Sequence, residues 1–208
     1  MILYVARHGE TTWNREGRYQ GQRESQLTDT GREQALALAG ALRERPLSAI
    51  YSSPLARCRD TARALADACA IEPTLDERLI EIGHGTWEGR LREDVERDDP
   101  ERFAQWRLHP DRVAFPGGET LGAVLERWRA FVASLVGAGE IAVVTHDVLV
   151  RLAILDASGR GSQRLWEPRV VNGGFARLEL HDGRLALLDE CIDSHLAGIL
   201  VDTSRQAL

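Results

Sequence analysis

The residues with the clearest chemical potential in this chain are an arginine and a histidine that stand side by side near its start. Arg7 and His8 directly follow an apolar run at residues 2–6, which is bounded by charge and is typical of a buried strand. A neutral imidazole can attack phosphorus, and a planar guanidinium can bind phosphate through two parallel hydrogen bonds. The pair therefore predicts a nucleophile with an anion-binding cation beside it, as phosphoryl transfer requires.

Three further segments place polar residues where buried strands are expected to end. Arg57 stands in the first turn of a helix expected after a strand at 49–52, where free backbone N–H groups also favour an anion. His146 follows an apolar run at 141–145, and Glu81 lies in a glycine-rich segment. Because open α/β sheets bind ligands at the carboxyl ends of their strands, we expect these side chains to converge. Together they supply a nucleophile, cations for a phosphate and a carboxylic acid for the leaving group.

The motifs around these residues, taken in order, resemble those of the histidine phosphatase superfamily, which includes the cofactor-dependent phosphoglycerate mutases. The first motif is RHGETTWN at residues 7–14. The others are LTDTGREQA at 27–35, SSPLARC at 52–58, LIEIGHGTWEG at 79–89, PGGET at 116–120 and VVTH at 143–146. The resemblance covers the chain from Leu3 to about Arg151, and the complete set is far more specific than any single motif.

The resemblance implies a metal-independent phosphomonoesterase of the histidine acid phosphatase type that needs no cofactor. His8 would attack phosphorus in line and carry the phosphoryl group as a covalent intermediate. Glu81 would protonate the departing alkoxide and then take a proton from the hydrolytic water. The resemblance assigns phosphate binding, as catalytic or substrate-binding residues, to Arg7, Asn14, Gln20, Gly21, Arg57 and His146.

Several of these assignments have a competing interpretation in the sequence. Glu77 and Glu88 are rivals of Glu81 for the role of proton donor, and the spacing to Gly85 and Gly89 favours Glu81. Arg57 alone could be a solvated helix residue, but its place in the 52–58 motif favours phosphate binding. The remaining histidines are expected to be structural, although the first of them lies close enough to the site to line it: His84, His109, His181 and His195.

One residue departs from the family pattern. Family members commonly carry glycine after the second histidine, whereas Asp147 follows His146 here. A carboxylate that faced the phosphate would oppose its binding by like charge. We therefore expect Asp147 to turn away and to cap the helix that begins at Val148. A contact with a hydroxyl or amine of the substrate is the less favoured alternative.

The elements that must position these residues indicate an α/β fold. Strands at 2–6, 49–52 and 141–145 alternate with helices, which predicts a three-layer α/β/α sandwich with a mostly parallel central sheet. Asp182-Gly183 between two apolar runs predicts a hairpin that adds an antiparallel edge strand. Helices are expected to start at Thr30, through a capping box with Glu33, and at Ser53, with Pro54 as its first residue. Further helices are expected at 121–136 and 148–155.

Length and composition favour one domain, at residues 1–208, in a globular protein. The segment at about 90–119 is charged and broken by prolines, so we expect a mobile flap inserted over the site. We expect the flap and its neighbours to shape the leaving-group pocket through Gln22, Arg23, Trp106 and Arg107. The net charge of −6 argues against nucleic-acid binding, and no apolar run is long enough to span a membrane. We expect a cytoplasmic protein whose partner is a small phosphate ester; a monomer and a homodimer are both compatible with the sequence.

Three other functions compete with phosphatase activity as interpretations of this sequence. A mutase of the phosphoglycerate type needs further cations for a second phosphate, and its family carries a longer insertion than the one at 90–119. The stretch RYQGQ at 18–22 also resembles the phosphatase branch. A non-catalytic phosphate-recognising module would be expected to lack His8 or Glu81, and a metal-dependent hydrolase would need paired histidine ligands. The sequence therefore favours the phosphatase, with the mutase as the alternative.

Overall fold

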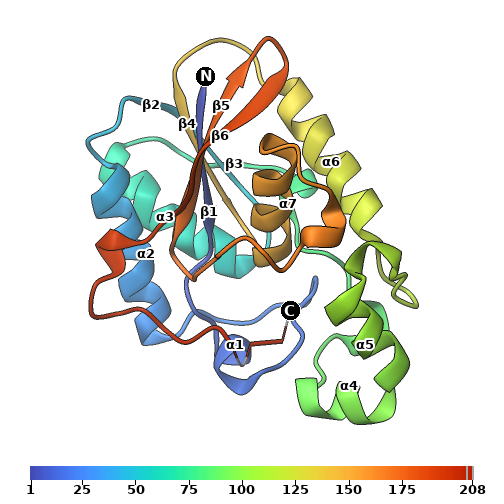
Figure 1. Cartoon of the computed structure of the whole chain (residues 1–208). Helices are drawn as coiled ribbons and strands as arrows, with labels where there is room; N and C mark the ends of the chain where they lie inside the picture. Colours follow the sequence, from blue (N-terminus) through green and yellow to red (C-terminus); the bar gives the residue numbers. More distant parts are fainter. Residues whose placement is uncertain (205, 208) are drawn as a thin grey trace.

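The computed structural model describes residues 1–204, 206 and 207, and six strands in this part of the chain form one mixed sheet (Figure 1). The strand order is β3-β2-β4-β1-β5-β6. The strands are β1 (Ile2–Arg7), β2 (Leu47–Ser52), β3 (Thr74–Leu75), β4 (Glu140–Thr145), β5 (Phe175–His181) and β6 (Arg184–Ile192). The pairs β3–β2, β2–β4 and β4–β1 are parallel, whereas β1–β5 and β5–β6 are antiparallel. The mostly parallel sheet with an antiparallel edge is as expected.

Long helices cover both faces of this sheet. In Figure 1, α2 (Asp29–Leu42) and α3 (Ala56–Cys69) lie on one side, and α6 (Leu121–Ser134) and α7 (Asp147–Ala157) lie on the other. Alternate side chains of a strand point to opposite faces, and β1 divides accordingly. Leu3 and Val5 pack into the apolar cluster of α6 and α7, whereas Tyr4 and Ala6 join that of α2 and α3. The predicted three-layer sandwich is confirmed.

The segment at 90–119, for which we expect a mobile flap, is largely helical. It contains α4 (Arg92–Asp98), α5 (Pro100–Leu108) and the short turn η3 (Pro110–Arg112). Pro100 begins α5 and Pro110 begins η3, at positions where the backbone N–H that proline lacks would have no partner within the helix. Phe103 and Trp106 on α5 are buried in the same cluster as α6 and α7. No helix within the described residues is long and apolar enough to cross a membrane.

Two helices begin at residues other than those expected. Thr28 caps α2, because its Oγ1 accepts a hydrogen bond from the Gly31 backbone N–H at 2.9 Å. Leu55 is the N-cap of α3 and makes no side-chain capping bond. The capping boundaries predicted at Thr30 and Ser53 were therefore wrong by two residues. Ser53 is left outside the helix, and its hydroxyl is used in the site described below.

The hairpin between β5 and β6 forms as predicted. Its two-residue turn places Asp182 at φ 49° and Gly183 at φ 73°, and both values lie in the left-handed region. Asp-Gly tolerates this conformation, whose twist matches that of the flanking strands. The shorter elements of the chain are α1 (Thr12–Glu16), η1 (Glu77–Leu79), η2 (Gly85–Trp87), η4 (Ser162–Arg164) and η5 (Ser194–Leu196).

Candidate active site

The polar residues expected to converge do lie together, at the carboxyl end of the parallel strands, which is the lower edge of the sheet in Figure 1. His8 directly follows β1 and His146 directly follows β4. Their ring centroids are 5.3 Å apart. Arg57, the second residue of α3, donates from Nε to Nδ1 of His146 at 3.2 Å. Adjacent parallel strands thus bring together three side chains that are far apart in sequence.

His8 is held in the form that a nucleophile requires. Its Nδ1 lies 2.7 Å from the carbonyl oxygen of Gly9. A carbonyl oxygen can only accept, so Nδ1 carries the proton and Nε2 keeps a free lone pair. Burial, and then the nearby charges of Arg57 and Arg7, hold the pKa of His8 well below its ordinary 6.5. The imidazole is therefore neutral at physiological pH.

Gly9 is required where it stands. A Cβ atom at this position would lie 2.2 Å from the carbonyl oxygen of Gly31, far inside contact distance. The start of α2 therefore packs directly against the backbone that follows the nucleophile. The Gly9 N–H donates to Thr61 Oγ1 at 3.1 Å, which ties the same backbone to α3.

Arg57 is fixed by three hydrogen bonds. Besides Nε to His146, Nη1 donates to the carbonyl of Arg23 at 2.8 Å and Nη2 to that of Gly21 at 2.7 Å. Gly21 thus contributes a backbone carbonyl that orients the cation. The neighbouring Gln20 accepts from Thr11 Oγ1 at 3.0 Å and braces the same loop. A guanidinium already oriented in this way loses little freedom when it binds an anion.

His146 has a partner that the sequence interpretation missed. Its Nδ1 accepts from Arg57, so in a neutral ring Nε2 carries the proton and donates to Ser53 Oγ at 2.8 Å. Burial is the main cause of the lowered pKa that keeps this ring neutral. Both nitrogens of His146 are therefore engaged within the protein. The sequence predicts Ser53 as a helix cap. The pair of serines at the start of the 52–58 motif is the sequence feature that could have indicated a second role for one of them.

Glu81 is a buried carboxyl group beside the nucleophile. Its side chain is 6% exposed, and Oε1 accepts from the backbone N–H of Ile82 at 2.9 Å. Burial raises the pKa of Glu81 to about 7, although the hydrogen bond from Ile82 lowers it. Of its rivals, Glu77 is exposed, and the Glu88 carboxylate accepts from the backbone N–H groups of Gln22 and His84. Glu81 is the one of the three that lines the cavity next to His8.

A small cavity joins these groups. Its volume is about 10 Å³. Its lining residues are Arg7, His8, Gln20, Gly21, Arg57, Glu81, His84 and Ala207. His84, expected to be structural although close enough to the site to line it, does line the cavity, and both of its ring nitrogens are buried without a hydrogen-bond partner among the described residues. Burial lowers the pKa of His84 to about 3, so this wall of the cavity presents a neutral imidazole.

Asn14 lies beside the cavity and does not line it. Its Oδ1 accepts from the N–H and the hydroxyl of Thr11, at 3.1 and 3.0 Å. Its Nδ2 is buried and has no hydrogen-bond partner within the described part of the chain. The amide thus retains the neutral donor that phosphate binding would use.

Arg7 and Asp147 form an ion pair that the sequence did not predict. The Nη1 atom of Arg7 is 2.9 Å from Oδ2 of Asp147, close enough for an ion pair although not aligned as a hydrogen bond. Nη2 of Arg7 donates to Oε1 of Gln206. The expected capping role of Asp147 is wrong, because α7 is capped by His146 without a side-chain bond. The attraction between the buried guanidinium of Arg7 and the carboxylate prevails over the cap.

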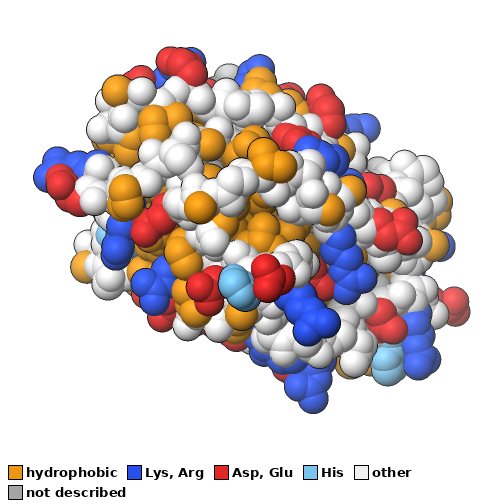
Figure 2. Space-filling model, turned by 90° about the horizontal axis from the view of Figure 1, so that it is seen from above, with side chains coloured by type: hydrophobic (Ala, Val, Ile, Leu, Met, Phe, Trp, Pro, Cys, Tyr) orange, Lys and Arg blue, Asp and Glu red, His pale blue; other side chains and the backbone are white. Residues whose placement is uncertain are grey.

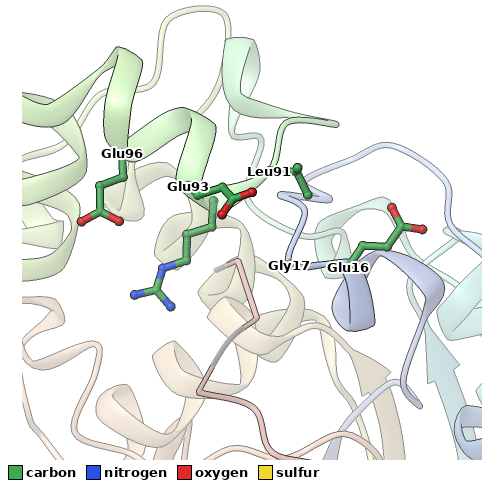
Figure 3. Close-up of a pocket in the computed structure, with 6 residues that line it drawn as sticks. Glu16, Gly17, Leu91, Glu93 and Glu96 are labelled. Atoms are coloured by element: carbon green, nitrogen blue, oxygen red, sulfur yellow. The ribbon is translucent and has the colours of Figure 1, made fainter.

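Larger pockets lie elsewhere on the molecule, and the one in Figure 3 is lined by residues that do not suit a phosphate. The one in Figure 3 has a volume of about 280 Å³ and lies between α1 and α4. Its lining includes three glutamates, Glu16, Glu93 and Glu96, and one arginine, Arg92, and this acidic excess disfavours an anion. The end of the molecule opposite the site shows a central apolar area with charges of both signs around it (Figure 2). Among the described residues, no three histidine, cysteine or acidic side chains group as metal ligands.

Comparison with known proteins gives concordant matches. A model of the histidine phosphatase superfamily (branch 1) matches residues 3–192. The chain is similar to phosphoserine phosphatase 1 of Hydrogenobacter thermophilus, with 34% identity over 98% of each chain. It is also similar to a probable phosphoglycerate mutase of Salmonella choleraesuis, with 36% identity over 88% of this chain and 86% of the other. The solved structure of YhfR from Bacillus stearothermophilus superposes with a TM-score of 0.89 at 33% identity and covers 94% of this chain and 98% of that one.

Proposed function

The chain belongs to the histidine phosphatase superfamily, and we propose that it hydrolyses a small phosphate monoester through a phosphohistidine on Nε2 of His8. As a phosphatase of this superfamily it is a metal-independent phosphomonoesterase. The observation that carries the proposed role of His8 is its neutral ring, with Nδ1 bonded to Gly9, in a cavity shared with Arg57 and Glu81.

The first half of the reaction transfers the phosphoryl group to the enzyme. The lone pair of His8 Nε2 forms a bond to phosphorus in line with the ester oxygen, whose bond to phosphorus breaks. Protonated Glu81 gives its proton to that oxygen, so the leaving group departs as an alcohol. Arg7 and Arg57 offset the charge on the phosphoryl oxygens, and such electrostatic stabilisation dominates catalysis of this kind.

The second half returns the enzyme to its starting state. Glu81, now a carboxylate, takes a proton from a water molecule as the oxygen of that water bonds to phosphorus. The bond between phosphorus and Nε2 breaks, and its electron pair returns to the His8 ring. The products are inorganic phosphate, neutral His8 and protonated Glu81, so the cycle closes without any other reactant.

Phosphate release from a panel of monoesters tests this proposal. Phosphoserine comes first because of the similarity to phosphoserine phosphatase 1, followed by 3-phosphoglycerate, sugar phosphates, nucleotides and nitrophenyl phosphate. We expect release from at least one small ester, at a rate that EDTA leaves unchanged. Activity that EDTA abolished and a divalent ion restored would contradict the mechanism.

The alternative function is phosphoglycerate mutase activity, which the similarity to the probable mutase supports. Among the described residues lining the cavity, Arg7 and Arg57 are the cationic ones. A bisphosphorylated sugar acid needs cations for both of its phosphates, so this lining favours one phosphate. We expect 3-phosphoglycerate with a 2,3-bisphosphoglycerate primer to give slow phosphate release without efficient isomerisation. Rapid formation of 2-phosphoglycerate would reverse the ranking of the two functions.

A further inference from the structure

A buried chain of three charges extends from the phosphate site into α7. Asp147, the first residue of α7, is 1% exposed. Its Oδ2 pairs with Nη1 of Arg7, and its Oδ1 accepts from Nε of Arg151, one helical turn further on. The carboxylate is thus clamped between two guanidinium groups, of which the inner one lines the cavity.

The outer guanidinium is itself fixed. Arg151 donates from Nη1 to the backbone carbonyl of Pro168. Its guanidinium carbon also lies 5.4 Å from the centre of the Trp166 ring. A side chain held by a backbone carbonyl and an aromatic face has little freedom to move. Arg151 therefore holds the Asp147 carboxylate in one place.

Charge alone does not account for Asp147. A carboxylate this close to the site weakens the attraction for a phosphate, and Arg151 cancels that negative charge. The three groups together carry the single positive charge that Arg7 would carry by itself. Since Asp147 and Arg151 together add no net charge, their contribution to phosphate binding has to come from the position in which they hold the Arg7 guanidinium.

We propose that Asp147, held by Arg151, is a positioning residue that fixes the guanidinium of Arg7 toward the phosphate. Asp147 holds Nη1 and Gln206 holds Nη2, while Nε of Arg7 has no hydrogen-bond partner among the described residues and is available to a phosphate oxygen. This role rests on the proposed phosphate site, and it requires no contact between Asp147 and the substrate.

An effect of charge and a positioning role for Asp147 predict opposite changes in the affinity of one variant for inorganic phosphate. Asp147→Asn removes a negative charge near the site, so on charge alone inorganic phosphate should bind more tightly. If Asp147 positions Arg7, phosphate should instead bind more weakly, and kcat/KM should fall about 10- to 100-fold, the size of a misplaced catalytic contact. Calorimetry with inorganic phosphate measures the binding without turnover. Tighter or unchanged binding would overturn the inference.

Further variants separate positioning from folding and from net charge. Asp147→Gly combined with Arg151→Leu removes the pair without changing net charge, and it leaves no unpaired charge between them to oppose folding. We expect this double variant to fold and still to bind phosphate weakly. Binding equal to that of the wild type would overturn the inference. The matched control is Asp156→Asn on the same helix, where Asp156 pairs with Arg129 away from the site, and its phosphate affinity should be unchanged.

A thermodynamic cycle decides whether Asp147 acts through Arg7. In an Arg7→Met background, Asp147→Asn should change kcat/KM by less than about twofold, because the group it positions is gone. If the losses in kcat/KM from Arg7→Met and from Asp147→Asn multiply instead, Asp147 acts independently of Arg7. Failure of the proposed function would give a different result. The wild type would then release no phosphate from any ester, while the differences in phosphate affinity between the wild type and the Asp147 variants would remain.

Discussion

Replacing His8 with alanine should lower kcat toward every phosphate monoester by about 10⁴-fold or more, since loss of a covalent nucleophile has effects of this order in other hydrolases. The remaining groups, Arg57 and Arg7, should still bind inorganic phosphate weakly. Within the described part of the chain, the ring that is removed makes its Nδ1 hydrogen bond to the carbonyl of the adjacent Gly9 and to no distant element, so the fold should survive. Steady-state kinetics, with circular dichroism to confirm folding, measures both parts.

The matched control is His181→Ala, because His181 is on the exposed hairpin with a side chain that is 83% exposed. Its turnover should equal that of the wild type. Acid-labile phosphate should be trapped on the wild type after a rapid quench and should be missing from the His8 variant. Normal turnover in a pure His8→Ala preparation would place the nucleophile on another residue.

The second large effect concerns Glu81 and depends on the leaving group. Glu81→Gln keeps the size of the side chain but cannot supply an acidic proton. An alkyl phosphate leaves as a poor alkoxide, so we expect kcat to fall by about 10²–10⁴-fold, the usual contribution of general acid catalysis. Nitrophenyl phosphate leaves as a stable phenolate and should lose much less. Phosphohistidine should accumulate with the aryl ester, because water then lacks its base.

The pH dependence provides a second measurement of the same group. Because the pKa of Glu81 is raised to about 7, the acid form is present below that pH and is lost above it. For an alkyl phosphate, kcat/KM should therefore fall as the pH rises through about 7, and Glu81→Gln should remove this limb. The exposed Glu77, changed to glutamine, should keep both the activity and the limb. Equal losses on both substrates, without phosphohistidine, would indicate that Glu81 only positions other groups.

The parts of the fold that were predictable are those in which local sequence and final packing agree. The runs at 2–6 and 141–144 are continuously apolar because β1 and β4 lie inside the sheet, covered on both faces. The edge strand β3 has two residues, Thr74 and Leu75, both exposed, and it leaves no such pattern. The helices of the 90–119 segment were not predicted, because its charges and prolines are compatible both with helices and with irregular chain, and the burial of Phe103 and Trp106 depends on tertiary packing.

The residues of the site also differ in whether local sequence predicts their role. His8, Arg57 and Glu81 stand in motifs with strong local signatures, and they line one cavity. The contacts of Asp147 with Arg7 and of Ser53 with His146 join distant segments, so no local pattern reports them. For Asp147 the helix N-terminus offered a plausible partner nearby. The buried guanidinium of Arg7, brought next to it by the pairing of β1 with β4, competed more strongly.

The central place of β1 in the sheet bears on how the protein is made. β1 is synthesised well before its neighbours in the sheet, which are β4, beginning at Glu140, and β5, beginning at Phe175. Until β4 has been made, this apolar strand therefore has both edges unpaired, a condition that favours aggregation and recognition by chaperones. The histidine at its end cannot be positioned until β4 has emerged, so nascent chains that stop before Glu140 should be inactive.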